Sequence, residues 1–100
     1  PKTRVVIQFG VAYGSDIEKV KEVVMKEIKT IKNLSKEPEP VIRFLEMANS
    51  SLNFKAYFHV DSFENRMDAI DEANTKIYNT LNKNNIGIPF PQMDVYLKKK

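Results

Sequence analysis

The strictest constraint on the fold is a pair of prolines near the end of the chain, Pro89 and Pro91. Each proline fixes its own φ angle and biases the residue before it away from the helical conformation. The segment around them must therefore run in an extended form close to polyproline geometry. Apolar and polar residues alternate after it, which predicts a last strand over residues 93–97. We expect the chain to end in a stiffened arm that leaves a compact body.

The length of the chain limits what that body can be. A chain of 100 residues with 42% hydrophobic content can bury one modest core, so one domain is expected. No run approaches the roughly 20 apolar residues that a membrane-spanning helix needs, and we expect this piece to be soluble by itself. Because it opens on Pro1 without a methionine, we also expect it to be a segment of a longer protein, with any membrane part upstream.

Cysteine content and charge exclude some classes of function. The chain has no cysteine, which rules out disulfides and thiolate chemistry and fits a reducing cytosolic compartment. The formal net charge of +3 is mild, and Lys98, Lys99 and Lys100 supply a charge of that size by themselves. This charge is poor support for a nucleic-acid surface, and we expect no nucleic-acid partner.

Hydrophobic periodicity predicts a strand followed by a helix in the first third of the chain. Residues 4–11 are rich in β-branched and aromatic side chains, which indicates a well-buried strand. Ser15 and Glu18 fit a capping box at a helix start. Apolar residues then recur at spacings of three and four, with lysines between them, and predict an amphipathic helix that ends near Asn33.

Two strands and a second helix are predicted next. The prolines of residues 37–40 break the first helix, residues 41–47 form a strand, and a tight turn leads to a further strand that starts at Leu52. In that strand apolar residues alternate with polar ones, so one face is buried. The second helix is expected from about Phe63 to Asn84, with Asn85 in the left-handed conformation that ends it. Its predicted buried stripe consists of Phe63, Met67, Ile70, Ala73, Ile77 and Leu81.

The order strand, helix, strand, strand, helix, strand indicates an α+β fold. It is typical of the ferredoxin-like βαββαβ sandwich, in which both helices lie on one side of an antiparallel sheet. We expect residues 1–88 to form this domain and residues 89–100 to form the arm with a terminal, barrel-type strand. A proline-stiffened arm can carry that last strand away from its own sheet, to pair with neighbouring chains.

Two groups of residues invite a chemical interpretation that their pattern does not support. The loop of residues 10–15 precedes a helix, where backbone donors can hold a phosphate, but it matches no phosphate-binding motif and Asp16 adds a negative charge there. His59 and Asp61 project to the same strand face, but two ligands in a chain without cysteine do not make a metal site. We expect no metal ion and no cofactor.

Other candidates for catalysis or binding also have ordinary structural explanations. Ser50 and Ser51 lack the context of a nucleophile and are typical of a turn. Tyr57 on an open sheet face invites comparison with RNA-binding modules, but their RNP1 pattern is absent. We therefore expect no catalytic residue and no enzyme activity.

Four short blocks of the sequence form a recognisable series: residues 10–16 (GVAYGSD), 37–41 (EPEPV), 50–54 (SSLNF) and 88–95 (IPFPQMDV). In this order they resemble the carboxy-terminal cytoplasmic domain of the MscS family of small-conductance mechanosensitive ion channels. Two residues depart from the family pattern, because Asn85 stands where a glycine is common and His59 where an aromatic residue is frequent. Asn is the usual substitute for Gly in the left-handed conformation, and an exposed strand position tolerates exchange.

The resemblance implies a structural domain in the wall of a heptameric cage, on the cytoplasmic side of the inner membrane beneath a pore formed by an upstream segment. It implies assembly with identical subunits and filtering of solutes during osmotic shock. Two alternatives stay open, a free-standing ferredoxin-like regulatory or ligand-binding module and a small enzyme that uses the loop of residues 10–15. The assembly residues that the resemblance implies are Pro89, Phe90, Pro91, Gln92, Met93, Asp94, Val95, Tyr96 and Leu97.

Overall fold

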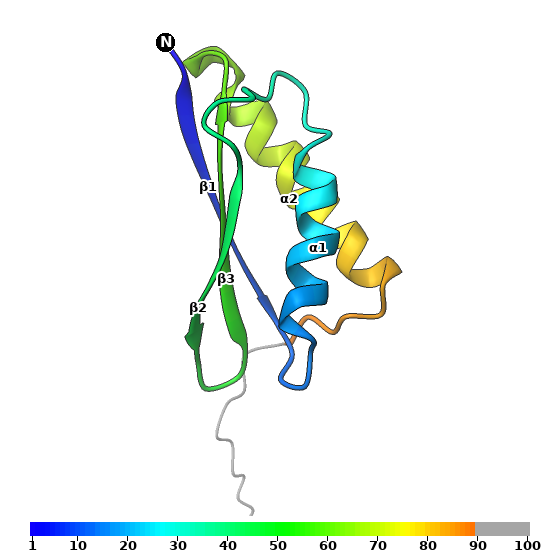
Figure 1. Ribbon diagram of the computed structural model, residues 1–100. Helices are drawn as coiled ribbons and strands as arrows, with labels where there is room; N and C mark the ends of the chain where they lie inside the picture. Colours follow the sequence, from blue (N-terminus) through cyan, green and yellow to red (C-terminus); the bar gives the residue numbers. More distant parts are fainter. Residues whose placement is uncertain (90–100) are drawn as a thin grey trace, which may run out of the picture.

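The computed structural model describes residues 1–89 and has two layers, a three-stranded antiparallel sheet and two helices on one of its faces (Figure 1). The strand order is β1-β3-β2. Neither helix of the described part is long and apolar enough to cross a membrane. The predicted α+β fold class is confirmed, while the predicted last strand at 93–97 lies outside the described residues. The elements are β1 (Thr3–Val11), α1 (Ile17–Ile28), β2 (Val41–Met47), β3 (Leu52–Val60), the 3-10 turn η1 (Phe63–Asn65) and α2 (Arg66–Lys83).

β3 is the centre of the sheet and separates the core from the open face. It pairs with β1 along its whole length, and with β2 in a register that shifts between Phe44 and Glu46. Its residues alternate between buried and half-buried, because successive side chains of a strand point to opposite faces. Phe54 and Phe58 belong to the core, and Tyr57 lies on the other face. The alternation predicted for this strand is confirmed.

β1 alternates in its first half only, and the prediction of a well-buried strand was wrong for its exposed residues Arg4, Val6 and Gln8. Val5, Ile7 and Val11 are buried, but Val6 is 40% exposed. Hydrophobic side chains on both faces had suggested burial on both sides. In the described part of the chain the helices cover only one face of the sheet, so the alternate residues of β1 stay accessible (Figure 1).

Phe54 lies at the centre of the core between the sheet and the helices. The centroid of its ring is 5.2 Å from that of Phe9 and 5.1 Å from that of Phe44. Because Phe54 is on the middle strand β3, its phenyl ring is flanked by one aromatic residue from each neighbouring strand. Both helices contribute aliphatic side chains to the same cluster, including Ile28 and Leu81.

α1 begins at a different cap from the one that the capping box predicts. The carboxylate of Asp16 accepts a hydrogen bond from the backbone N–H of Lys19 at 3.1 Å, so Asp16 is the N-cap. The hydroxyl of Ser15 instead donates to the carbonyl of Ala12 at 2.7 Å. Aspartate and serine are about equally good N-caps, and the turn before the helix decides between them.

α1 also ends earlier than predicted, at Ile28 rather than near Asn33. The N–H groups of Thr30 and Ile31 bond to carbonyls three residues back, which is the tighter 3-10 pattern. Asn33 then takes a φ of 65°, which a helix does not allow. Ile31 is nevertheless buried, because the turn folds it back onto the core. The helix was predicted to continue past Ile28 because the apolar side chain of Ile31 fits the helical period.

α2 confirms only part of its predicted buried stripe. Ala73, Ile77 and Leu81 are buried, but Phe63 is 74% and Met67 is 68% exposed. Phe63 belongs to the 3-10 turn that precedes the helix, so the helical period does not apply to it. Met67 lies roughly 120° around the helix from Ala73, because each residue adds about 100°. These two assignments were wrong.

A charged cluster ties α2 to the end of α1. A carboxylate oxygen of Glu72 accepts from the backbone N–H of Lys32 at 3.1 Å, and the other lies 2.8 Å from the ammonium of Lys76. Lys76 also donates to the hydroxyl of Thr30 at 2.7 Å. The hydrogen bond from Lys76 holds the pKa of Glu72 below its ordinary value of 4.5, against the opposing effect of partial burial. This cluster fixes the two helices relative to each other.

Candidate assembly site

Of the nine residues that the family resemblance implies for assembly, only Pro89 belongs to the described part of the chain. It is half-buried. Phe90, Pro91 and residues 92–97 lie outside the described residues, so their predicted role stays a prediction. The structure does describe the segment from which they depart, residues 84–89, and the end of the molecule that this segment crosses.

The turn after α2 sets the direction of that segment. Asn85 has a φ of 58°, as predicted for the residue that ends this helix. Its N–H bonds to the carbonyl of Asn82 at 3.1 Å, and the N–H of Ile86 bonds to the carbonyl of Leu81 at 2.9 Å. These two bonds make a Schellman motif, which satisfies carbonyls left over at the helix end. Ile86 then packs against the core and anchors the turn.

The segment is next tied to the end of β1. The backbone N–H of Ala12 donates to the carbonyl of Gly87 at 2.9 Å. A Cβ atom on Gly87 would lie 3.3 Å from the Cβ of Ala12, a contact tighter than most. Glycine thus allows the close approach of the two backbones. The path of the chain up to Gly87, two residues before Pro89, is therefore determined by contacts with the body.

The same end of the molecule holds a polar network within the β2–β3 hairpin, beside the end of β1. Gly10 lies opposite Asn53, and a Cβ on Gly10 would lie 3.2 Å from Oδ1 of Asn53 and 3.3 Å from the Cβ of Ser51. The hydroxyl of Ser51 donates to Oδ1 of Asn53 at 2.6 Å. Nδ2 of Asn53 donates to the carboxylate of Glu46 at 2.9 Å. Gly10 leaves the room in which this network is formed.

Tyr13 links the loop after β1 to the hairpin. Its hydroxyl donates to the carbonyl of Ala48 at 2.5 Å, across 35 residues of sequence. In Figure 1 the hairpin turn, the loop between β1 and α1, and the departing segment all lie at the bottom of the molecule. Three of the four sequence blocks, residues 10–16, 50–54 and the start of 88–95, thus meet at one end. The sequence did not predict these contacts; its only signal was the position of the blocks.

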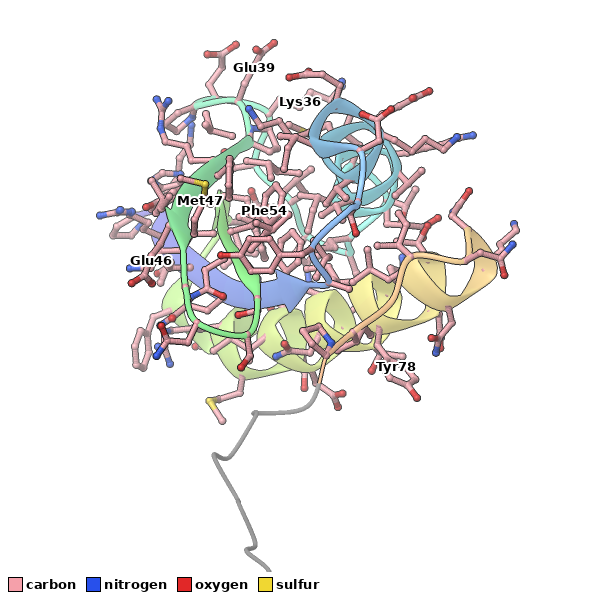
Figure 2. All side chains as sticks on the ribbon, turned by 90° about the horizontal axis from the view of Figure 1, so that it is seen from below. Lys36, Glu39, Glu46, Met47, Phe54 and Tyr78 are labelled. Carbon is pink, nitrogen blue, oxygen red and sulfur yellow. The ribbon has the colours of Figure 1, made fainter. Side chains whose placement is uncertain are left out.

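Apolar side chains are exposed at this end. Tyr13 is 54%, Met47 is 74% and Ile88 is 39% exposed. Figure 2 views the molecule from this end, and Met47 and Glu46 lie on β2 while Tyr78 lies on the opposite side, on α2. Exposed apolar surface around a polar network is typical of contact sites between proteins. We refer to Tyr13, Met47, Ile88 and the network around Asn53 as the arm-end surface.

The other candidates from the sequence are placed in ordinary positions. The loop of residues 10–15 precedes a helix whose first turn is already capped by the carboxylate of Asp16. The N–H of Asp61 bonds to the carbonyl of Asn33, and His59 lies on the open sheet face. Among residues 1–89 no group of three or more histidine, cysteine or acidic side chains is placed to hold a metal ion.

Comparison with known proteins identifies relatives along nearly the whole chain. The family model for the C-terminal domain of the mechanosensitive ion channel MscS matches residues 5–88. A small-conductance mechanosensitive channel of Edwardsiella ictaluri is 41% identical over 107 residues, covering 97% of this chain and 34% of that protein. The mechanosensitive channel MscK of Escherichia coli K12 is 37% identical over 95 residues, covering 95% of this chain and 8% of that protein.

A solved structure agrees in fold. The crystal structure of Helicobacter pylori MscS in the closed state aligns with 99% of this chain and 39% of that chain, with a TM-score of 0.85 and 30% sequence identity. The chain therefore spans about a third or less of the curated relatives named above, and a little more than a third of the solved channel subunit.

Proposed function

This chain belongs to the MscS family of mechanosensitive ion channels, as one of its C-terminal domains, and on that premise we propose that it builds part of the cytoplasmic cage of a tension-gated channel. In this role it is a structural domain rather than an enzyme. Seven identical subunits form the cage on the cytoplasmic side of the inner membrane. A segment outside this chain provides the membrane anchor and the pore, and the cage filters solutes during osmotic shock.

The observation that carries the proposal is the likeness to the Helicobacter pylori channel. A TM-score of 0.85 over 99% of this chain is a match of whole architecture, and 30% identity accompanies it. The named relatives are likewise mechanosensitive channels. A domain with this architecture and these relatives is best explained as the corresponding part of a channel.

The arm-end surface supports the assembly role. Residues 84–89 are turned by Asn85 and tied through Gly87 to β1, so the segment beyond Pro89 starts from a defined position. We propose that residues 89–97 of each subunit then join their counterparts in a small barrel. Closing a barrel satisfies strand edges that a single chain leaves open. The exposed side chains of Tyr13, Met47 and Ile88 are available to neighbouring subunits around that barrel.

The assembly role is tested in the full-length channel that contains this domain. We expect Val95→Asp to reduce the fraction of complete heptamers, because it puts a charge among the alternating apolar residues of the proposed barrel strand. Native mass spectrometry of the detergent-solubilised channel gives the subunit number. Lys99→Asp is the matched control, because it adds the same side chain four residues later and outside the alternation.

A second experiment uses a variant that lacks residues 90–100. We expect the truncated channel to form fewer complete heptamers than the intact one. The 100-residue chain with the same truncation, expressed separately, should keep its helical signal in circular dichroism. If both Val95→Asp and the truncation leave the subunit number unchanged, these residues have no assembly role. Patch recording of the same variants under a pressure ramp then tells whether assembly and gating depend on the same segment.

A further inference from the structure

A shallow pocket of about 390 Å³ lies on the open face of the sheet, on the side away from the helices. All three strands and the loop before β2 contribute to it, so it spans the width of the sheet. Its size is within the range of roughly 300–1,000 Å³ that is usual for small-molecule sites. The lining residues are Arg4, Pro38, Glu39, Val41, Arg43, Tyr57 and His59.

The pocket carries positive charge that the described part of the chain leaves unpaired. Arg4 on β1 and Arg43 on β2 both line it, and both are exposed. Within residues 1–89 the only salt bridge is that between Lys76 and Glu72, so neither arginine has a carboxylate at ion-pair distance there. Two guanidinium groups on either side of β3 therefore face one shallow space.

Tyr57 and His59 form the floor of this space on β3. The guanidinium carbon of Arg4 lies 5.0 Å from the centroid of the Tyr57 ring, a cation–π geometry that limits the freedom of the arginine. Nδ1 of His59 is buried and has no hydrogen-bond partner among residues 1–89. Because this nitrogen is shielded from solvent, a group in the shallow pocket does not reach it, and the imidazole of His59 serves only as part of the pocket floor.

We propose that this pocket binds a small anion through a carboxylate or phosphate group. The guanidinium fork matches both groups with two parallel N–H···O bonds, and an arginine already held against an aromatic ring loses less freedom on binding. Both arginines supply charge and Tyr57 holds one of them. Glu39 also lines the pocket, and its carboxylate repels an anion. Among residues 1–89, none of the segment 84–89 lines the pocket, so the argument for this site does not use the proposed assembly role.

The proposal is tested on the 100-residue chain by amide NMR titration. Inorganic phosphate and acetate are titrated separately, each against sodium chloride at equal ionic strength. We expect saturable shifts in the amides around Arg4, Arg43 and Tyr57, with a Kd on the order of 1 mM, an affinity of about 4 kcal/mol. Saturation by phosphate alone identifies a phosphate-bearing ligand, and saturation by acetate alone identifies a carboxylate. Shifts that rise linearly for both, or that chloride reproduces, overturn the proposal.

Three variants make the assignment specific to these residues. Arg43→Gln is expected to weaken binding roughly tenfold, since a hydrogen bond to a charged group is lost. Glu39→Gln is expected to tighten binding, because it removes the opposing charge. Lys19→Gln, which removes a charge from an exposed position on α1, is the matched control and is expected to leave the Kd unchanged. Equal weakening by Lys19→Gln and Arg43→Gln means that the response is a general charge effect, and the pocket is then not a site.

Discussion

Phe54 shows how much of the stability depends on a single side chain. It is 1% exposed, and the rings of Phe9 and Phe44 flank it from both neighbouring strands. We expect Phe54→Ala to lower the free energy of unfolding by about 3–5 kcal/mol, the usual cost of emptying a buried aromatic position. Urea denaturation of the 100-residue chain followed by circular dichroism measures the change.

Phe63→Ala is the matched control, because it removes the same side chain from a different position. Phe63 is 74% exposed, so its truncation should change the free energy of unfolding by no more than about 0.5 kcal/mol. A loss as large as that for Phe54 would show that Phe63 is packed in solution. The sequence had placed both side chains in the core. Strand alternation identified Phe54 correctly, but the helical period was extended backward over Phe63, where the chain forms a 3-10 turn instead.

The contact between the two helices depends on pH through Glu72. The folded state lowers the pKa of Glu72, chiefly through the hydrogen bond from Lys76. The stabilisation is therefore fully present above the unfolded-state pKa, and it is lost as the pH falls through the lower folded-state value. We expect Glu72→Gln to cost about 1 kcal/mol at neutral pH, and this deficit to disappear in acid. Urea denaturation at a series of pH values from neutral to acid measures it.

Glu22→Gln on the exposed face of α1 is the control for this element, since Glu22 is exposed. Its stability should follow that of the parent chain at every pH. A deficit of Glu72→Gln that stays constant into acid would mean that packing, rather than charge, links the helices.

At the scale of elements, the sequence predicted the strands better than the helix ends. β2 has the predicted bounds and β3 the predicted start, because prolines and a turn separate them from their neighbours and alternation identifies the buried face. α1 was predicted too long because Ile31 fits the helical period although it is buried from a turn. For Ile31, periodicity predicted the burial correctly but not the backbone conformation that buries it.

The whole molecule should exchange its amide hydrogens unevenly, because β3 is paired on both sides and β1 on one side in the described part of the chain. We expect the amides of β3 to exchange most slowly, near the rate of global unfolding. Every second amide of β1 points away from β3 and should exchange much faster. Hydrogen exchange of the 100-residue chain, read by NMR, tests this pattern.

This measurement also tests the detached last strand. In a closed ferredoxin-like sheet, residues 93–97 would pair with β1 and protect its outward amides. Uniformly slow exchange along β1 in the monomeric chain would therefore contradict the proposal that these residues leave their own sheet. Fast exchange at alternate positions is the expected result.

At the scale of the molecule, the four blocks predicted the family correctly, but not the contacts at the arm-end surface. The arm expected from Pro89 and Pro91 stays a prediction, because residues 90–100 lie outside the described part of the chain. Tyr13 and Ala48 are 35 residues apart in sequence, and nothing in either residue type indicates that they meet. Gly10 was predicted to lie where the first strand passes into the loop before a helix, without a role of its own. Its role becomes clear once the register of β1 against β3 places it opposite Asn53. Long-range contacts of this kind depend on the assembled sheet.

The turn at Asn85 and the bond between Ala12 and Gly87 have a practical consequence for protein engineering. Since the chain is oriented before it reaches Pro89, its heading does not depend on the residues attached beyond that proline. The domain can therefore be used in fusion proteins: a designed oligomerisation peptide attached after Pro89 starts in a known direction without a rigid linker.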